Sequence, residues 1–156
     1  MAKKPSPDGL TLDEQLCFAV YSAAHAFTAA YKPALEPLGL TYPQYLVLMI
    51  LWEKDGLSVK EVGQKLFLDS GTLTPLLKRL EAAGFVRRRR DPADERVVRI
   101  HLSDQGREVR QTGAAARAAV VCALGGQEAE IQELRAAVNK MRDMLRAARP
   151  SSGEVA

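Results

Sequence analysis

Two cysteines are the residues of this chain most able to carry out redox chemistry. Cys17 lies in the segment TLDEQLCFAVY, residues 11–21, and Cys122 lies in AAVVCAL, residues 118–124. A thiolate can be oxidised to a sulfenic acid, which a second thiol captures as a disulfide. A cysteine can equally be a small buried hydrophobic residue, and the apolar neighbours of Cys122 favour burial. Residue type alone leaves both readings open.

The sequence around Cys17 opposes a reactive thiol. Thr11 and Glu14 have the spacing of a capping box and precede apolar residues at helical spacing, so we expect a helix to begin at Thr11. Cys17 would then lie about six residues past the cap. The helix dipole favours an anion mainly within the first turn, so it would help Cys17 little. Asp13 and Glu14 would lie one turn before it and disfavour a thiolate. A reactive Cys17 would need hydrogen-bond donors from elsewhere, and tyrosine hydroxyls are suitable.

Composition excludes several other classes of protein. The two cysteines and two histidines, His25 and His101, have no close spacing, so we expect no metal site and no cofactor. The length of 156 residues and the 47% apolar content indicate one globular domain, residues 1–156. No apolar run reaches the ~18 residues of a membrane span, and none follows the two N-terminal lysines as in a secretory signal. We therefore expect a cytoplasmic protein with free thiols and no membrane partner.

The net charge of +3 is concentrated in one short segment. Residues 85–101 contain six arginines and three acidic residues, a local balance of 6 − 3 = +3. The rest of the chain has 22 − 6 = 16 basic and 19 − 3 = 16 acidic residues. Such a concentration indicates a polyanionic partner, although a solvated run of charge is the alternative.

Hydrophobic spacing predicts a mainly α protein with one small β-hairpin. After Gly84 the hydrophobic period changes, and residues 85–90 and 96–102 are predicted strands joined by the turn sequence DPADE, with period-two alternation in the second. The last helix carries a heptad-like apolar stripe that predicts pairing with other helices, within the chain or across a dimer: Ile131, Leu134, Val138, Met141 and Leu145. The expected helices are residues 11–36, 41–54, 58–66, 70–83, 103–124 and 127–149.

The order of short helix, helix and basic hairpin is that of a winged helix-turn-helix, which we expect within residues 43–102. This arrangement suits double-stranded DNA, because a helix fits the major groove and arginines suit the minor groove or the backbone. The second short helix buries its leucines. It turns outward the side chains expected to contact DNA, namely Ser70, Thr72, Thr74, Lys78 and Arg79.

The segment LFLDSGTLTPLLKRLEAAGFVRRRRDPADERVVRIHLSDQG resembles the MarR family of dimeric repressors, and the resemblance extends over residues 10–149. It implies a MarR-type winged helix-turn-helix fold and a wing whose DNA-binding residues include Arg90, Asp94 and Arg96. It also implies a homodimer built by residues 11–36 and 103–149. Two recognition helices would then lie one DNA turn apart on a pseudo-palindromic operator.

The segments LDEQLCFAVY and LGLTYPQYLVLMILWE resemble the organic-hydroperoxide-sensing branch of that family, the OhrR-type repressors. The resemblance implies that organic hydroperoxides oxidise Cys17 and that Tyr31 and Tyr42 hold its thiol. It also implies that Cys122 is the resolving cysteine of a two-cysteine subgroup. A Cys17–Cys122 disulfide between subunits would then release the operator, and the protein would be a regulator rather than an enzyme.

Helix geometry restricts which tyrosine can reach which thiol. Tyr31 lies 14 residues after Cys17, about 21 Å along a continuous helix, so a Tyr31 that touches Cys17 belongs to the partner subunit. Tyr21, four residues after Cys17, is a lesser candidate within the chain. An apolar pocket of Phe18, Leu48 and Trp52 would favour organic peroxides over hydrogen peroxide.

Two other functions remain open at this stage. One is a MarR-type repressor relieved by a reversible aromatic ligand, with Cys17 incidental. The other is a thiol peroxidase enzyme, although no arginine or threonine lies close to Cys17 in the sequence to activate a peroxide.

Overall fold

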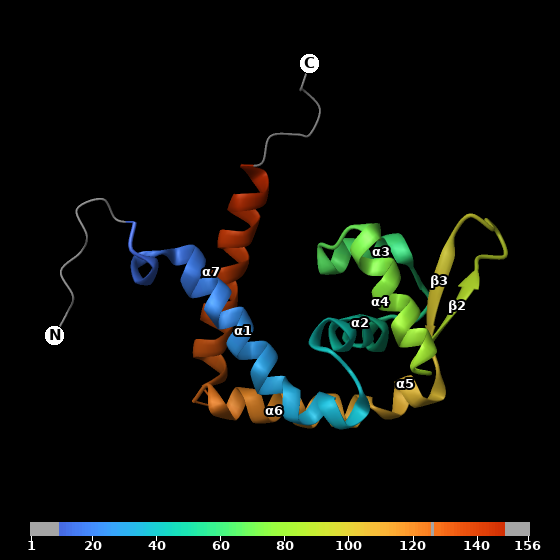
Figure 1. Cartoon of the computed structure of the whole chain (residues 1–156), viewed down its shortest axis with the longest axis horizontal. Helices are drawn as coiled ribbons and strands as arrows, with labels where there is room; N and C mark the ends of the chain where they lie inside the picture. Colours follow the sequence, from blue (N-terminus) through green and yellow to red (C-terminus); the bar gives the residue numbers. More distant parts are fainter. Residues whose placement is uncertain (1–9, 126, 149–156) are drawn as a thin grey trace, which may run out of the picture. The chain divides into compact units, whose positions relative to one another are not determined.

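A computed structural model of the chain describes residues 10–125 and 127–148. The chain separates into two compact units, residues 1–117 and 118–156. Both ends of the predicted 1–156 domain lie outside the described residues, as do residues 126 and 149 of the predicted dimerisation segment 103–149. The elements, shown in Figure 1, are η1 Leu12–Glu14, α1 Leu16–Leu35, η2 Glu36–Leu38, α2 Tyr42–Glu53, β1 Leu57–Ser58, α3 Val59–Leu66, α4 Ser70–Ala82, β2 Val86–Arg90, β3 Val98–Leu102, α5 Asp104–Glu108, α6 Arg110–Ala123 and α7 Glu128–Ala147.

Helix α2 forms the centre of the first unit. It begins with a capping box in which the Thr41 N–H donates to Gln44 Oε1 over 2.8 Å, and Pro43 lies in its first turn, where no N–H is needed. Half of its twelve residues are buried, as its uniformly apolar sequence predicts. The side chains that share this core come from α1, α4 and the hairpin: Tyr31, Leu35, Leu73, Leu77, Leu80, Phe85 and Ile100.

Helices α3 and α4 form the predicted pair of short helices. Ser58 caps α3: its hydroxyl accepts the Glu61 N–H at 3.2 Å, and the Glu61 carboxylate accepts the Ser58 N–H at 2.7 Å. Phe67 then adopts a left-handed conformation with φ of 57°, which turns the chain sharply into α4. Leu73, Leu77 and Leu80 are buried on one side of α4, which confirms the predicted inward face of this helix.

The hairpin is part of a three-stranded antiparallel sheet in the order β1-β3-β2. The hairpin strands were predicted, whereas the two-residue strand β1 was not, because Leu57 and Ser58 pair with Ile100 and Arg99, some 40 residues away. Val86, Ile100 and Leu102 turn toward the core. The mainly α fold with a β-hairpin wing is thus confirmed.

The helix predicted to run from Ser103 is interrupted after one turn. Ser103 caps α5, with its hydroxyl accepting the Gly106 N–H at 3.0 Å, and α5 ends at Glu108, with Val109 as its C-cap at a ψ of −4°, before α6 begins at Arg110. Gly113 of α6 lies against Tyr45 and Trp52, where an added Cβ would approach ring atoms of both within 3.0 Å. The absence of a side chain therefore lets α6 approach the aromatic face of α2 closely.

The second unit contains the end of α6 and all of α7. Three of the five residues in the apolar stripe of α7 are exposed, Leu134 to 57%, Val138 to 45% and Leu145 to 64%, and Ile131 and Met141 are half-buried. Burial of such a stripe requires further helices, since exposed contiguous apolar faces are unfavourable in water.

The start of α5 provides a stability test. A Cβ on Gly106 would overlap the carbonyl of Phe85, and the Gly106 carbonyl accepts the Trp52 indole N–H at 2.8 Å. We expect Gly106→Ala to lower the free energy of unfolding by about 1–3 kcal/mol, because packed backbone must move. Urea unfolding followed by fluorescence of Trp52, the sole tryptophan, measures this. The matched control is Glu108→Ala, at an exposed position of the same helix. Equal stability of the two variants would contradict the prediction.

Candidate functional site

Helix α4 presents the polar side chains predicted to contact DNA. Asp69 caps it, with one carboxylate oxygen accepting the Thr72 N–H and the other the Thr72 hydroxyl, both at 2.9 Å. These bonds, the backbone bond first, hold the pKa of the Asp69 carboxyl below its ordinary value. The helix therefore starts in one fixed geometry and carries its own anion at its N-terminus. Ser70, Thr72, Lys78 and Arg79 are exposed and Thr74 is half-buried.

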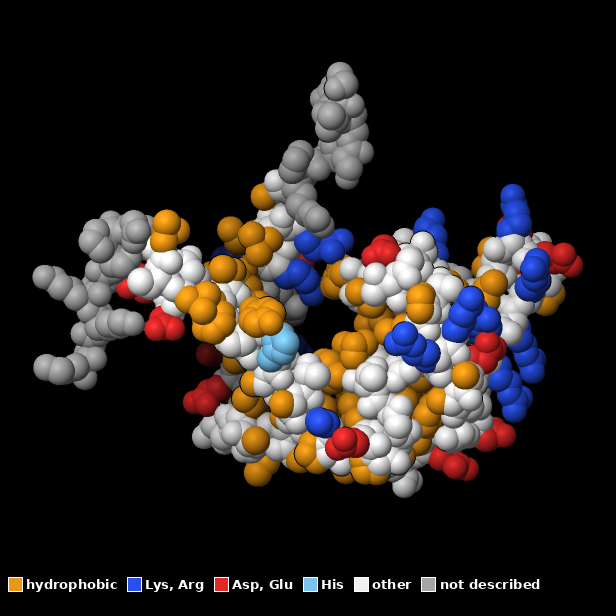
Figure 2. Space-filling model, in the orientation of Figure 1, with side chains coloured by type: hydrophobic (Ala, Val, Ile, Leu, Met, Phe, Trp, Pro, Cys, Tyr) orange, Lys and Arg blue, Asp and Glu red, His pale blue; other side chains and the backbone are white. Residues whose placement is uncertain are grey.

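The hairpin forms a basic surface next to α4. Figure 2 shows Lys and Arg side chains gathered over these elements. The arginines at positions 87, 89, 90 and 96 are exposed. The Arg90 guanidinium donates to the Glu95 carbonyl at 3.3 Å, across the turn between the strands.

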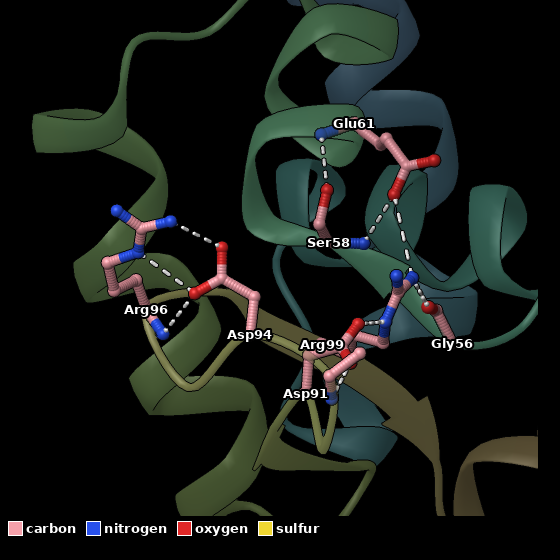
Figure 3. Close-up of polar contacts among 8 residues, drawn as sticks. Gly56, Ser58, Glu61, Asp91, Asp94, Arg96 and Arg99 are labelled. Carbon is pink, nitrogen blue, oxygen red and sulfur yellow. Dashed lines mark hydrogen bonds and ion pairs between the residues drawn. The ribbon is translucent and has the colours of Figure 1, made fainter.

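Arg96 is held at the tip of the wing by Asp94. Its guanidinium donates to both carboxylate oxygens, at 2.9 and 3.0 Å, and its backbone N–H donates to Asp94 at 3.1 Å (Figure 3). The Arg96 side chain is 90% exposed, and the pairing lowers the pKa of Asp94 and raises that of Arg96. Orienting the guanidinium in advance reduces the entropy lost when it meets a phosphate or a base.

The other two arginines of the basic segment turn toward the protein. Arg88 pairs with Glu81 of α4 at 2.7 Å, and Arg99 contacts Asp91, Gly56 and Glu61. The charge count did not separate these arginines from the exposed ones. Strand alternation could have placed Arg88 on the core face, because it shares that face with Val86.

Cys17 lies in the first turn of α1, so the prediction that it lies beyond that turn was wrong. Thr11 makes no side-chain capping bond, and residues 12–14 form a separate 3₁₀ turn. The Gln15 side chain donates to the Thr11 carbonyl at 3.2 Å and closes that turn, and Gln15 itself is extended. Helix α1 therefore begins at Leu16, and Cys17 is its second residue and exposed. This is where free N–H groups and the helix dipole favour an anion.

Tyr31 and Tyr42 lie together in a cluster that also includes Tyr45. The ring centroids of Tyr31 lie 5.2 Å from Tyr42 and 5.3 Å from Tyr45. Burial raises the pKa of all three phenols, that of Tyr45 to about 12, so they remain hydroxyl donors at neutral pH. Tyr45 donates to the Gly113 carbonyl at 3.0 Å. The sequence interpretation missed Tyr45, although its place three residues after Tyr42 puts both on one helix face.

Within one chain the thiol and the tyrosine cluster lie far apart. Helix α1 is continuous from Leu16 to Leu35, so Cys17 and Tyr31 are separated by about 21 Å along it. Tyr21, the lesser candidate, is 59% exposed and its ring lies 4.3 Å from that of His25.

The three residues of the predicted apolar pocket have different surroundings. Leu48 is fully buried, Phe18 stacks on Tyr21, and Trp52 lies at a different place, beside a cavity of about 290 Å³. That cavity is lined by Leu51, Trp52, Asp55, Leu102, Arg107 and Arg110.

Cys122 lies in the last turn of α6, in the second unit, and is exposed. The alternative that both cysteines are buried in the core of the chain is therefore wrong. Among residues 10–125 and 127–148 no cluster of three or more His, Cys, Asp and Glu could hold a metal ion. Over the same residues, no helix combines the length and apolar content needed to cross a membrane.

Sequence comparisons relate the chain to transcriptional regulators. Residues 29–112 match the family model described as transcriptional regulator SarA/Rot. The chain is 64% identical over 110 residues to the HTH-type transcriptional regulator TtmR of Methylorubrum extorquens (strain PA1). That match covers 70% of this chain but only 56% of TtmR, little more than half its length. The chain is also 50% identical over 99 residues to the organic hydroperoxide resistance transcriptional regulator of Bacillus subtilis (strain 168), covering 64% of this chain and 67% of that protein.

Solved structures of AbfR, a protein of Staphylococcus epidermidis, have a similar fold. Reduced AbfR bound to DNA is 35% identical, with a TM-score of 0.77, and the match covers 90% of this chain and 96% of AbfR. AbfR in its disulfide form is also 35% identical, with a TM-score of 0.62, over 83% of this chain and 91% of that one.

The tyrosine cluster gives a stability prediction with a defined pH window. The pKa of Tyr45 is about 12 in the folded protein and 10.0 in the unfolded chain. Tyr45 therefore stabilises the fold fully below pH 10, and this stabilisation is lost as the pH rises toward 12, because the unfolded chain ionises first. Tyr45→Phe should be about 1 kcal/mol less stable than wild type at pH 8, through loss of the bond to Gly113, and the gap should narrow by pH 11.

Urea unfolding at both pH values, followed by Trp52 fluorescence, measures the gap. Tyr21→Phe, at an exposed position, is the matched control and should follow wild type. A gap that stays constant or widens with pH would show that the Tyr45 hydroxyl is not the group concerned.

Proposed function

Because the chain belongs to the MarR family of winged helix-turn-helix transcriptional regulators, in its OhrR-type branch, we propose that it is a repressor controlled by organic hydroperoxides. The reduced homodimer binds a pseudo-palindromic operator, and oxidation of Cys17 releases it. The protein acts by binding DNA and carries out no catalytic turnover. The observation that carries the proposal is an exposed first-turn thiol on the same continuous helix as a buried tyrosine, about 21 Å apart.

The separation of thiol and tyrosines supports a site completed by a second subunit. Cys17 needs donors for its thiolate, and the hydroxyls of Tyr31 and Tyr42 remain protonated at neutral pH. Cys17 lies near the start of α1 and Tyr31 near its end, so the Tyr31 of the same chain cannot reach Cys17. In the proposed dimer the partner subunit brings its tyrosine pair to Cys17.

The exposed apolar side chains of α1 and α7 support the homodimer. On α1, Leu16 is 66% exposed and Val20 39%, and on α7 Leu134, Val138 and Leu145 are likewise exposed. In the proposed assembly these faces pack against the same faces of a second copy, which removes apolar surface from water.

DNA binding is supported by the geometry of α4 and the wing. Helix α4 offers hydroxyls and cations to the major groove, from Ser70, Thr72, Thr74, Lys78 and Arg79. The wing offers Arg90 and the Asp94-oriented Arg96 to the minor groove or to phosphates. The relative AbfR has been solved bound to DNA in its reduced state.

The proposed redox step begins at Cys17. Its thiolate attacks the terminal oxygen of the hydroperoxide, the O–O bond breaks, an alcohol leaves, and Cys17 becomes a sulfenic acid. The thiol of Cys122 from the partner subunit then attacks that sulfur, and water leaves as the disulfide forms. The two sulfurs must approach to about 2.05 Å, which displaces the helices that carry them and changes the spacing of the two α4 helices.

The central prediction concerns Cys17→Ser. A duplex selected from a random pool by the reduced wild-type protein serves as the operator. Cumene hydroperoxide should release wild type and leave Cys17→Ser bound with its affinity unchanged, because a serine hydroxyl is not oxidised. Fluorescence anisotropy of the labelled duplex measures binding. Release of the serine variant by the peroxide would overturn the proposal.

A separate prediction concerns the resolving role of Cys122. After peroxide treatment, wild type should run as a dimer on a non-reducing denaturing gel, and Cys122→Ser should run as a monomer. A Cys122→Ser protein that still forms the intersubunit band would exclude the Cys17–Cys122 disulfide. Thiol labelling of Cys17 before and after treatment controls for oxidation that stops at the sulfenic acid.

A second candidate function is favoured by the cavity beside Trp52. Its lining combines Leu51, Trp52 and Leu102 with the charged Asp55, Arg107 and Arg110, and although Asp55 pairs with Arg107 at 2.7 Å, the apolar side chains and Arg110 suit a reversible aromatic acid. Release of the duplex by a phenolic acid, but not by cumene hydroperoxide, would favour this function over the redox one.

A further inference from the structure

We propose that Arg99 is a positioning residue, which ties the wing to the start of α3 and raises DNA affinity without contacting a phosphate. The inference rests on the proposed DNA-binding function and adds to it a residue that carries no direct contact. It separates Arg99 from the exposed arginines of the hairpin, whose charges are offered to DNA.

Three separate elements meet at the Arg99 guanidinium. Arg99 is the second residue of β3 and donates through Nε to the carboxylate of Asp91, which directly follows β2 (Figure 3). Its Nη1 donates to the carbonyl of Gly56, before β1, at 3.0 Å. The same Nη1 lies 4.0 Å from the carboxylate of Glu61, in the first turn of α3.

The partners of Arg99 are themselves held by backbone hydrogen bonds. The second carboxylate oxygen of Asp91 accepts the Ala93 N–H at 2.8 Å, and the Asp91 side chain is only 13% exposed. The Ala93 bond and then the Arg99 bond keep the pKa of Asp91 below its ordinary value, so it is ionised at neutral pH. Glu61 accepts the Ser58 N–H at 2.7 Å. Because backbone N–H groups hold both carboxylates in place, the contacts that Arg99 makes with them restrict the position of the wing.

Arg89 provides a natural contrast within the same sheet. It is the direct cross-strand partner of Arg99 in the β2–β3 register, so both side chains lie on one face. Two cations opposite each other repel, and Asp91 and Glu61 offset that repulsion through Arg99. Arg89 is exposed, so its charge is available to a polyanion.

The chemistry of the contact requires arginine. A guanidinium presents several N–H donors in a planar fork, which reaches Asp91 and Gly56 at the same time. A lysine at this position keeps the charge but has a single ammonium at the end of its side chain. Arg99→Lys therefore keeps the positive charge while removing the two simultaneous contacts, so its effect reports the positioning role alone.

The test measures affinity for the selected duplex by anisotropy over a range of salt concentrations, with reduced protein. We expect Arg99→Lys and Arg99→Gln each to weaken binding about five- to tenfold at one salt concentration. Neither should change the slope of log K against log[salt], because no phosphate contact is lost. Arg89→Gln, the matched control, should lower the slope by about one.

Amide hydrogen exchange provides a second readout that does not depend on DNA. The Arg99 variants should exchange faster across β2 and β3, while α2 remains as protected as in wild type. If wild type binds no duplex, the proposed function fails, and exchange alone decides whether Arg99 holds the wing.

Three results would overturn the inference. The first is a slope reduced by about one in Arg99→Gln and restored in Arg99→Lys, which identifies a phosphate contact. The second is wild-type affinity in both Arg99 variants while wild type itself binds well. The third is unchanged exchange of the hairpin amides.

Discussion

The burial of helix α2 is the constraint on which the first unit depends. Its sequence is apolar on nearly every side, so it cannot lie at the surface and must be covered by several elements at once. Helices α1 and α4 and strand β3 pack against it, and Gly113 lets α6 approach Tyr45 and Trp52. The tyrosine cluster and the elements that support the wing therefore share one close-packed core. In such a core a displacement on one side is transmitted to the other, since there is little free volume to absorb it.

The basic segment contains residues of two kinds. Arg88 and Arg99 neutralise carboxylates of the protein and hold the hairpin against α4, β1 and α3. The exposed arginines form a positive surface. Their mutual repulsion is unfavourable unless a polyanion binds there. Arg96 combines both features, because Asp94 orients it while its side chain stays almost fully exposed. A rigid hairpin with cations at its tip can place charge in a groove at little entropic cost.

The two halves of the proposed thiol site differ in their surroundings. Cys17 stands in the first helical turn and in solvent, where an anion is favoured and an oxidant can reach it. The tyrosines lie in the core, where burial keeps their hydroxyls protonated. A sensor divided in this way stays incomplete until two chains meet. In the proposed homodimer, assembly and sensing depend on the same apolar faces of α1 and α7.

Local spacing and residue type were enough to predict the helices with strong periodicity, the caps at Ser58 and Asp69, the hairpin and the outward face of α4. The sequence also predicted the roles of Tyr31 and Tyr42 through family resemblance. The fold decided where α1 starts: residues 12–14 form a separate 3₁₀ turn and Gln15 is extended, so the Thr11–Glu14 spacing does not mark the first turn of α1. The fold likewise decided that Tyr45 joins the cluster, that β1 extends the sheet and that Arg99 faces Gly56 and Asp91. The pairing of β1 with β3 and the contact of Arg99 with Gly56 join residues some 40 positions apart, and local spacing carries no record of them.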